Sequence, residues 1–451
     1  MTHQLNSRRQ VAFMVMAVLA LMVTAWIWLA LHGTATAAAA TTPSTPTSLR
    51  GRALTATSVT VSWHSAADAT RYAIIVDGHE RETTDARSVR ITSLKPASTH
   101  DINVQAIDAS GHRSSRSVFL PVTTRAGTSC TLYAASSGGT NSGDGSRVHP
   151  VSTATRLVEL AGAGDVACLS GSFVEDLTIR HGGTRDAPLT LRSTPGLSRA
   201  TIRGRMWVTD NANNVVIAGL NIDGTNLDGG ELPSPTIEGD RVRLLDNDIT
   251  NHRHHICVIL GSIHGFGAAR SAVLDGNRIH DCGRRPGNNH HHGVYLENAI
   301  GTRITNNVIA DSADRGIQLY PSSQNALIAR NVLFRNGEGV IFSGNEGYAS
   351  NGNRVVDNVI TWARTRYNIE YWWPEGNPVG QRNLAARNCV WHGAWGNIAE
   401  VEPGLPRGFE TRSNLTADPL FRAPTSGDYR PRSGSPCSGQ FSGLAPLTRL
   451  T

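Results

Sequence analysis

Aromatic and charged side chains recur at matching places in a series of short segments in the second half of the chain. The segments read GVYLE from Gly293, GIQLY from Gly316, GVIFS from Gly339 and NIEYW from Asn368. In a β-strand, alternate side chains point to opposite faces. One face is then apolar, with Val294, Leu296, Ile317, Leu319, Val340, Phe342, Ile369 and Tyr371. The opposite face carries Tyr295, Glu297, Gln318, Tyr320, Glu370 and Trp372. Aromatic faces stack on sugar rings and polar neighbours orient them, which predicts a carbohydrate-binding groove.

Further polar and aromatic residues stand at the ends of these segments. Strict alternation would turn most of them inward, but a turn before or after a strand can re-aim a side chain outward. We assign the following as substrate-binding, together with Gln318, Tyr320, Glu370 and Trp372: His254, His255, Glu338 and Trp373.

These residue types are compatible with three functions. A lyase needs a base to remove the proton beside a uronate carboxyl, for which we select His292 or Tyr295, with Arg315 as the carboxylate clamp and Glu297 as a further catalytic candidate. A hydrolase needs a carboxylate pair, such as Glu297 with Glu338 or Glu370, roughly 6.5–9.5 Å apart in an inverting enzyme. The third function is a non-catalytic cell-envelope or adhesion protein that only displays a sugar-binding surface.

A metal site is a weaker expectation. Asp223, Asp228 and Glu231 lie close together in the sequence, and oxygen-rich loops suit calcium. The run His290 to His292 is a poor metal site, because adjacent side chains on a strand point in different directions. Calcium is therefore the one cofactor that the sequence suggests.

An internal repeat predicts the scaffold that positions these residues. An asparagine followed by any residue and then Ile, Val or Leu recurs at 24–30-residue intervals, at Asn247, Asn277, Asn307, Asn331, Asn358 and Asn388. Repeats of short strands bury their apolar faces only when stacked, as in a parallel β-helix. We expect each asparagine to adopt a left-handed turn and to bond with the asparagines of neighbouring coils. A short amphipathic helix from Ser152 is expected to cap the open end.

The preceding part of the chain has a different organisation. Residues 1–40 combine Arg8 and Arg9 with a long apolar run from Val11, which predicts a signal peptide or a signal anchor. A linker (41–46) and a small β-sandwich (47–124) follow. The sandwich is indicated by alternation such as Val59, Val61 and Trp63. The β-helix then takes residues 130–440 and a tail takes 441–451.

Two resemblances add to this interpretation. The segments VSWHSAADATRYAIIVDG and LKPASTHDINVQAIDASGHRSSRS resemble a fibronectin type III domain, with His100 where that family usually has tyrosine. The stretches AGDVACLSGSFVEDLTIR and NNVVIAGLNIDG resemble the chondroitinase B and alginate lyase family and family 9 pectate lyases. The second resemblance implies a right-handed β-helix of the pectin-lyase type that acts on polysaccharides. The lysine base of those lyases has no counterpart here, because Lys95 is the only lysine.

Cysteines and charge complete the expectations. Even cysteine counts in exported chains favour disulfides, and position along the coils predicts the pairs Cys130–Cys168, Cys257–Cys282 and Cys389–Cys437. The formal charge of +6 permits anionic partners. We expect an acidic polysaccharide as partner, no nucleic acid, and a monomer. Its expected location is outside the cell or on the outer face of the membrane, with membrane contact only through the N-terminal segment.

Overall fold

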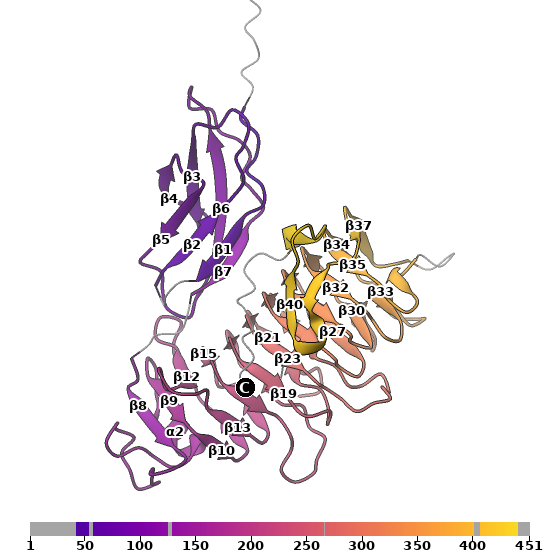
Figure 1. Ribbon diagram of the computed structural model, residues 1–451. Helices are drawn as coiled ribbons and strands as arrows, with labels where there is room; N and C mark the ends of the chain where they lie inside the picture. The colour runs from indigo at the N-terminus through magenta and orange to yellow at the C-terminus, as the bar shows by residue number, and fades with distance from the viewer. Residues whose placement is uncertain (1–41, 54–56, 125–128, 266, 401–405, 441–451) are drawn as a thin grey trace, which may run out of the picture.

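The computed structural model describes residues 42–53, 57–124, 129–265, 267–400 and 406–440. These residues form a small β-sandwich followed by a long β-helix (Figure 1). The expected export segment, residues 1–40, and the tail, residues 441–451, lie outside the described residues. Within the described ranges, no helix is both long and apolar enough to cross a membrane.

The sandwich has two antiparallel sheets. One contains β1 (Arg50–Ala53), β2 (Val59–Ser62) and β5 (Ser88–Ile91). The other contains β4 (His79–Thr84), β3 (Arg71–Val76), β6 (Thr99–Ile107) and β7 (Leu120–Thr123). The predicted inward residues Val61, Trp63 and Ile74 are buried between the sheets. His100 bonds Asp77 through Nδ1 (2.7 Å) and Ser98 through Nε2 (2.7 Å), so histidine serves as a polar anchor at this position.

Three parallel sheets form the walls of the β-helix, and the chain visits them in the order I, II, III in each coil. Sheet I contains β11 (Leu177–Ile179), β14 (Met206–Val208), β17 (Thr236–Ile237), β20 (Val258–Leu260), β24 (Val294–Ile300), β27 (Arg315–Gln324), β30 (Glu338–Ser343), β33 (Tyr367–Trp372) and β36 (Gly396–Ile398), with β21 (Ala269–Arg270) beside β24. Sheet II contains β8 (Leu132–Ala135), β9 (Val166–Ser170), β12 (Leu189–Ser193), β15 (Val215–Ala218), β18 (Arg243–Leu245), β22 (Val273–Asp275), β25 (Arg303–Thr305), β28 (Leu327–Ala329), β31 (Arg354–Val356), β34 (Asn383–Ala386) and β37 (Phe409–Arg412). Sheet III contains β10 (Ser172–Val174), β13 (Thr201–Arg203), β16 (Asn221–Asp223), β19 (Asp248–Thr250), β23 (Arg278–His280), β26 (Val308–Ala310), β29 (Val332–Phe334), β32 (Val359–Thr361), β35 (Cys389–Trp391) and β38 (Leu415–Thr416).

The core of the β-helix is a set of aligned apolar columns. Val294, Ile317, Val340 and Ile369 are register partners on successive strands of sheet I, and all four are fully buried. This alignment confirms the apolar face that the sequence predicted. Because side chains alternate, the intervening column of Tyr295, Gln318, Ile341 and Glu370 points away from the core.

The predicted asparagines form a continuous ladder between sheets II and III. Each side-chain amide donates to the asparagine oxygen of the next coil, from Asn247 to Asn388 and on to Asn414, at 2.9–3.0 Å. The expectation that the asparagines take the left-handed conformation is wrong. The residue before each asparagine takes it instead, as Asn306 (φ 57°) and Arg330 (φ 59°) do. That turn residue leaves the asparagine free to point inward and bond along the stack.

The N-terminal end of the solenoid is closed as expected. Helix α2 (Ala154–Leu160) begins at Thr153, whose hydroxyl accepts from the Arg156 amide (3.1 Å), and buries Leu157 against the first coils. The structure forms disulfides between Cys130 and Cys168, Cys257 and Cys282, and Cys389 and Cys437, which are the predicted pairs.

Two of the three outer faces are covered. The C-terminal hairpin consists of β39 (Phe421–Ala423) and β40 (Asp428–Pro431), joined through the 3-10 turn Pro424–Ser426 and followed by the 3-10 turn Ser438–Gln440. It packs Phe421 and Tyr429 on Phe334 of sheet III. The sandwich lies against sheet II, where Ala97 joins an apolar cluster with Val216, Ala218, Leu245 and Val273. Among the described residues, neither the sandwich nor the hairpin covers sheet I, where Trp372 is 45 % exposed while Gln318, Ile341 and Glu370 are 8 %, 2 % and 1 % exposed.

Polar contacts also fix the sandwich on sheet II. Arg303 donates to both carboxylate oxygens of Asp101 (2.8 and 2.7 Å) and lies over the Phe119 ring (5.8 Å). Arg243 donates to the Ala97 carbonyl, and Arg330 donates to the Leu49 carbonyl (3.4 Å). These contacts join distant segments of the chain, which makes the sandwich a docked part of the molecule and not a free spacer.

Replacing Arg303 with alanine is expected to loosen this docking. The variant loses a bidentate ion pair and a cation–π contact, a loss of about 1 kcal/mol for a partly exposed pair. Calorimetry should show the sandwich unfolding at a lower temperature than the β-helix, and proteases should cut between the domains sooner. Arg113→Ala is the matched control, because Arg113 pairs with Glu80 inside the sandwich. Unfolding and cleavage identical to those of that control would contradict the docking.

Candidate functional site

An aromatic row runs along the open face of sheet I. Tyr295 and Tyr320 lie on neighbouring strands with ring centroids 6.2 Å apart and planes 23° apart, and Trp372 continues the row 6.0 Å from Tyr320. The strand between those of Tyr320 and Trp372 carries Ser343, a small buried residue that is the register neighbour of Trp372. The Asn345 amide donates to the Tyr320 hydroxyl (3.1 Å), and Trp372 is 45 % exposed. We call Tyr295, Tyr320 and Trp372 the aromatic platform.

A buried group of charges lies where the strands of sheet I begin. Arg315 donates through Nε to Glu338 (2.8 Å) and through Nη1 to the Asn289 carbonyl (2.9 Å). Arg366 donates to Glu370 (2.9 Å) and lies 3.7 Å from Glu338. The side chains of Glu338 and Glu370 are 3 % and 1 % exposed. The sequence predicted Arg315, Glu338 and Glu370 at this face but missed Arg366.

Glu370 holds a proton at neutral pH. Burial raises the pKa of its carboxyl to about 8, and the neighbouring Glu338 carboxylate raises it further against the opposing effect of Arg366. Glu370 Oε1 has no hydrogen-bond partner among the described residues, and neither has Oε1 of Gln318. The site therefore combines a protonated carboxyl with a carboxylate whose charge two arginines balance.

Histidines pack beside the platform. The His292 ring meets Tyr295 edge-on at 5.5 Å, and its Nδ1 is buried without a partner among the described residues. Burial, and then the charge of Arg315, hold the pKa of His292 well below its usual value, so its ring is neutral. Burial raises the pKa of Tyr295, which weakens that residue as a base.

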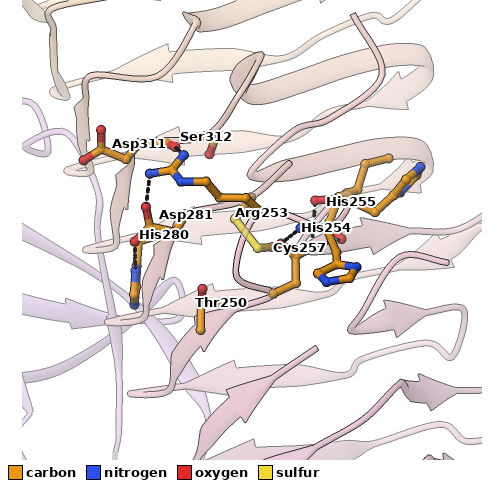
Figure 2. The surroundings of a disulfide bond; sticks show 12 residues. Thr250, Arg253, His254, His255, Cys257, His280, Asp281, Asp311 and Ser312 are labelled. Atoms are coloured by element: carbon orange, nitrogen blue, oxygen red, sulfur yellow. Dashed lines mark hydrogen bonds and ion pairs between the residues drawn. A yellow bond between two sulfur atoms is a disulfide. The ribbon is translucent and has the colours of Figure 1, made fainter. Parts of the chain in front are cut away.

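His254 and His255 lie farther back, directly before the disulfide cysteine Cys257 (Figure 2). His255 packs on His291 (4.9 Å), and burial followed by the His291 charge lowers its pKa to about 4. In the same surroundings, Arg253 pairs with Asp281 and donates to the Asp311 carbonyl (3.1 Å), which ties neighbouring coils together. His254 and His255 thus belong to the loop packing and not to the platform.

The acidic side of the face centres on Glu297. A bulge after Leu296 places Glu297 opposite Tyr320 and Pro321. Its Oε1 accepts from the Ile263 amide (3.1 Å) and the Ser262 hydroxyl (3.3 Å), and burial raises the pKa of the carboxyl.

Three tryptophans differ from the sequence-based assignment. Trp373 donates to the Arg407 carbonyl (2.9 Å) and packs against the core, so it lies beneath the face. The sequence missed Trp207, which shares a register column with Thr236, Ile259 and Tyr295, and Trp395, whose ring lies 4.6 Å from the Arg366 guanidinium. The alternation Met206-Trp207-Val208 could have predicted that Trp207 points outward, although the coil of Trp207 lacks the repeat asparagine.

The expected calcium site is not formed. Asp223 lies beside Arg203 (3.6 Å) and His252 (3.3 Å), Asp228 accepts from the Gly230 amide, and Glu231 pairs with Arg284 (2.5 Å). Each carboxylate is already used in a separate contact. Within the described part of the chain, no three His, Cys, Asp or Glu side chains group so that they could hold a metal ion.

The fold and this face define a two-domain β protein, a fibronectin type III sandwich docked on a right-handed parallel β-helix. Residues 44–120 match the model of the fibronectin type III domain, and residues 208–373 match the model of the right handed beta helix region.

Individual relatives are distant. An α-amylase of Niallia circulans is 34% identical over 94 residues, which are 20% of this chain and only 7% of that protein. The crystal structure of pectate lyase Pel9A has a TM-score of 0.49 at 15% identity, covering 72% of this chain and 91% of that one. The complex of XylC with xylose has a TM-score of 0.44 at 11% identity, covering 60% and 70%.

Proposed function

We propose that this chain binds a polysaccharide outside the cell on the open face of sheet I and hydrolyses it there. The observation that carries the proposal is the aromatic platform, three rings in a row on a face that neither the sandwich nor the hairpin covers. Planar rings in a row suit an extended sugar chain, and the polar groups beside them orient it.

The buried charges supply the reaction. Glu370 lies two residues before Trp372 on the same outward side of β33, so a sugar on the platform reaches the neighbourhood of its carboxyl. A glycosidic bond breaks when a carboxylic acid protonates the leaving oxygen and a carboxylate assists. Glu370 is protonated at neutral pH and takes the acid role, and Glu338 takes the carboxylate role.

Lyase cleavage is the second candidate. It is favoured by the neutral His292 ring beside Tyr295 and by the resemblance to the chondroitinase B and alginate lyase family. It is disfavoured by Arg315, whose guanidinium already bonds Glu338 and the Asn289 carbonyl. The products separate the two reactions, because elimination leaves an unsaturated sugar that absorbs ultraviolet light and hydrolysis does not.

Replacing Trp372 or Tyr320 with alanine is expected to weaken glycan binding about tenfold or more. Each loss removes an aromatic surface whose burial under a ligand is worth about 1.5–3 kcal/mol, and about 1.4 kcal/mol corresponds to a factor of ten. Titration calorimetry on the best glycan from an array measures the change. Trp362→Ala is the matched control, since Trp362 is an exposed tryptophan that follows sheet III.

The catalytic part is tested separately. Glu370→Gln keeps the size of the side chain but removes the acidic proton, so cleavage should stop while binding remains. Unchanged binding in Trp372→Ala would contradict the platform, and unchanged turnover in Glu370→Gln would contradict the assigned acid.

A further inference from the structure

We propose that the glycan bound on the aromatic platform is uncharged, and that polyuronates and sulfated glycans are discriminated against. The inference rests on the proposed function and names the substrate class of the same face. It departs from the sequence-based expectation of an acidic polysaccharide.

Two carboxylates lie beside the platform: the exposed Glu346 and the largely buried Glu297, which is 9 % exposed. Glu297 follows Tyr295 by two residues on β24 and lies opposite Tyr320 across the bulge. Glu346 directly follows Asn345, whose amide holds the Tyr320 hydroxyl, and its side chain is 48% exposed. The Glu346 carboxylate lies 3.8 Å from Nε2 of His264, whose side chain is largely exposed. An anionic sugar on the rings would therefore approach two acidic groups.

The nearest arginines do not compensate for these carboxylates. Arg315 is bonded to Glu338, and Arg366 is bonded to Glu370 while its guanidinium also faces the Trp395 ring. Clamping a uronate by Arg315 requires breaking its buried pair with Glu338, which leaves the Glu338 carboxylate without that partner in a site of low exposure.

The face offers acceptors to hydroxyl donors instead. Gln318 is the register neighbour of Tyr295 and is 8 % exposed, and its Oε1 has no partner among the described residues. Glu297 has a second oxygen beyond the one that binds Ser262 and Ile263. Sugar hydroxyls donate to carboxylate and amide oxygens. Glu297 offers its second oxygen, while Gln318 Oε1 is buried and is reached only if the groups around it move.

The experiment compares uncharged and charged polymers on the full chain. The uncharged set contains gluco-, xylo-, manno-, galacto- and chito-oligosaccharides. The charged set contains oligogalacturonate and alginate oligosaccharides, and fully methyl-esterified and de-esterified homogalacturonan form a pair that differs only in charge. We expect at least one uncharged glycan to bind, in a manner abolished by Trp372→Ala, about tenfold or more tighter than any polyuronate at low salt.

Charge removal makes the test specific. The double variant Glu297→Gln/Glu346→Gln should bind the de-esterified, charged polymer more tightly than the wild type does. This should narrow the gap in affinity between the esterified and de-esterified polymers. Glu159→Gln/Glu410→Gln is the control, since both residues lie away from sheet I on α2 and β37 and should leave the gap unchanged. Tight, Trp372-dependent binding of a polyuronate would overturn the inference and leave the proposed function standing. Binding of no polymer would overturn both.

Discussion

Replacing Asn307 with alanine is expected to lower the free energy of unfolding by about 3 kcal/mol, since a buried polar group left unpaired costs about 1–3 kcal/mol. The Asn307 amide donates to Asn331 Oδ1 and to the Leu274 carbonyl (both 2.9 Å), and its oxygen accepts from both the backbone and the side chain of Asn277 (both 2.9 Å). Alanine removes these four hydrogen bonds from a buried part of the stack, where water cannot replace them.

Thermal and denaturant unfolding measure this effect. Asn211→Ala is the control, because Asn211 is exposed and its amide bonds only the adjacent Asp210 among the described residues. Glycan affinity of the folded Asn307→Ala protein should equal that of wild type, since the ladder lies between sheets II and III and not on sheet I. A melting temperature equal to that of the control would show that the ladder contributes no net stability.

Raising the pH from about 6.5 to 8.5 is expected to destabilise the protein. Glu370 has its pKa raised to about 8, so the folded state holds a proton that the unfolded state releases near its ordinary value of 4.5. His280 acts in the same direction. Burial lowers its pKa, but hydrogen bonds to Asp248 and Asp281 outweigh burial and raise it. Stabilisation by such groups is lost as pH rises through their folded pKa, by at most about 1.4 kcal/mol per pH unit for each proton.

Melting curves between pH 6 and 9 check this expectation. Glu370→Gln should flatten the fall between pH 6.5 and 8, because glutamine carries no titratable proton. His280→Gln should reduce the fall further, independently of the platform. A wild-type melting temperature that rises between pH 7.5 and 9, above the range in which unfolded histidines titrate, would contradict a protonated Glu370 in the folded state.

The sequence predicted the parts of the molecule that repeat. The asparagine ladder and the apolar columns recur coil after coil, and the faces of the apolar and aromatic residues of sheet I follow from strand alternation. The pair Cys257–Cys282 followed from coil length, Cys130–Cys168 from the capping helix that it brackets, and Cys389–Cys437 was the remaining pair. Two further asparagine contacts, Asn353 with Asn383 (3.1 Å) and Asn368 with Asn397 (2.9 Å), were not predicted, because each joins a single pair of coils and does not recur along the stack.

The parts that do not repeat could not be predicted. Arg366 lies in a loop, and only the folded coil brings it to Glu370, four residues ahead. The docking of the sandwich depends on Asp101 meeting Arg303, which are 202 residues apart. Arg315 donates to the buried Glu338, and the loop carbonyl of Asn289 accepts a second hydrogen bond from the same guanidinium and fixes its position. Such contacts depend on turn geometry, for which the sequence carries no period.

Because the strands of sheet I stack in register, each coil adds one strand spacing to the length of this sheet. Neighbouring parallel strands lie about 4.8 Å apart whatever the length of the loops that join them, and the ladder contacts here tolerate separations of 24, 27 and 30 residues. Insertion of one complete coil would therefore lengthen the platform by one strand spacing and leave the capping helix and the hairpin unchanged. If the face binds a glycan as proposed, the number of sugar units that it holds depends on the number of coils and not on the length of the loops.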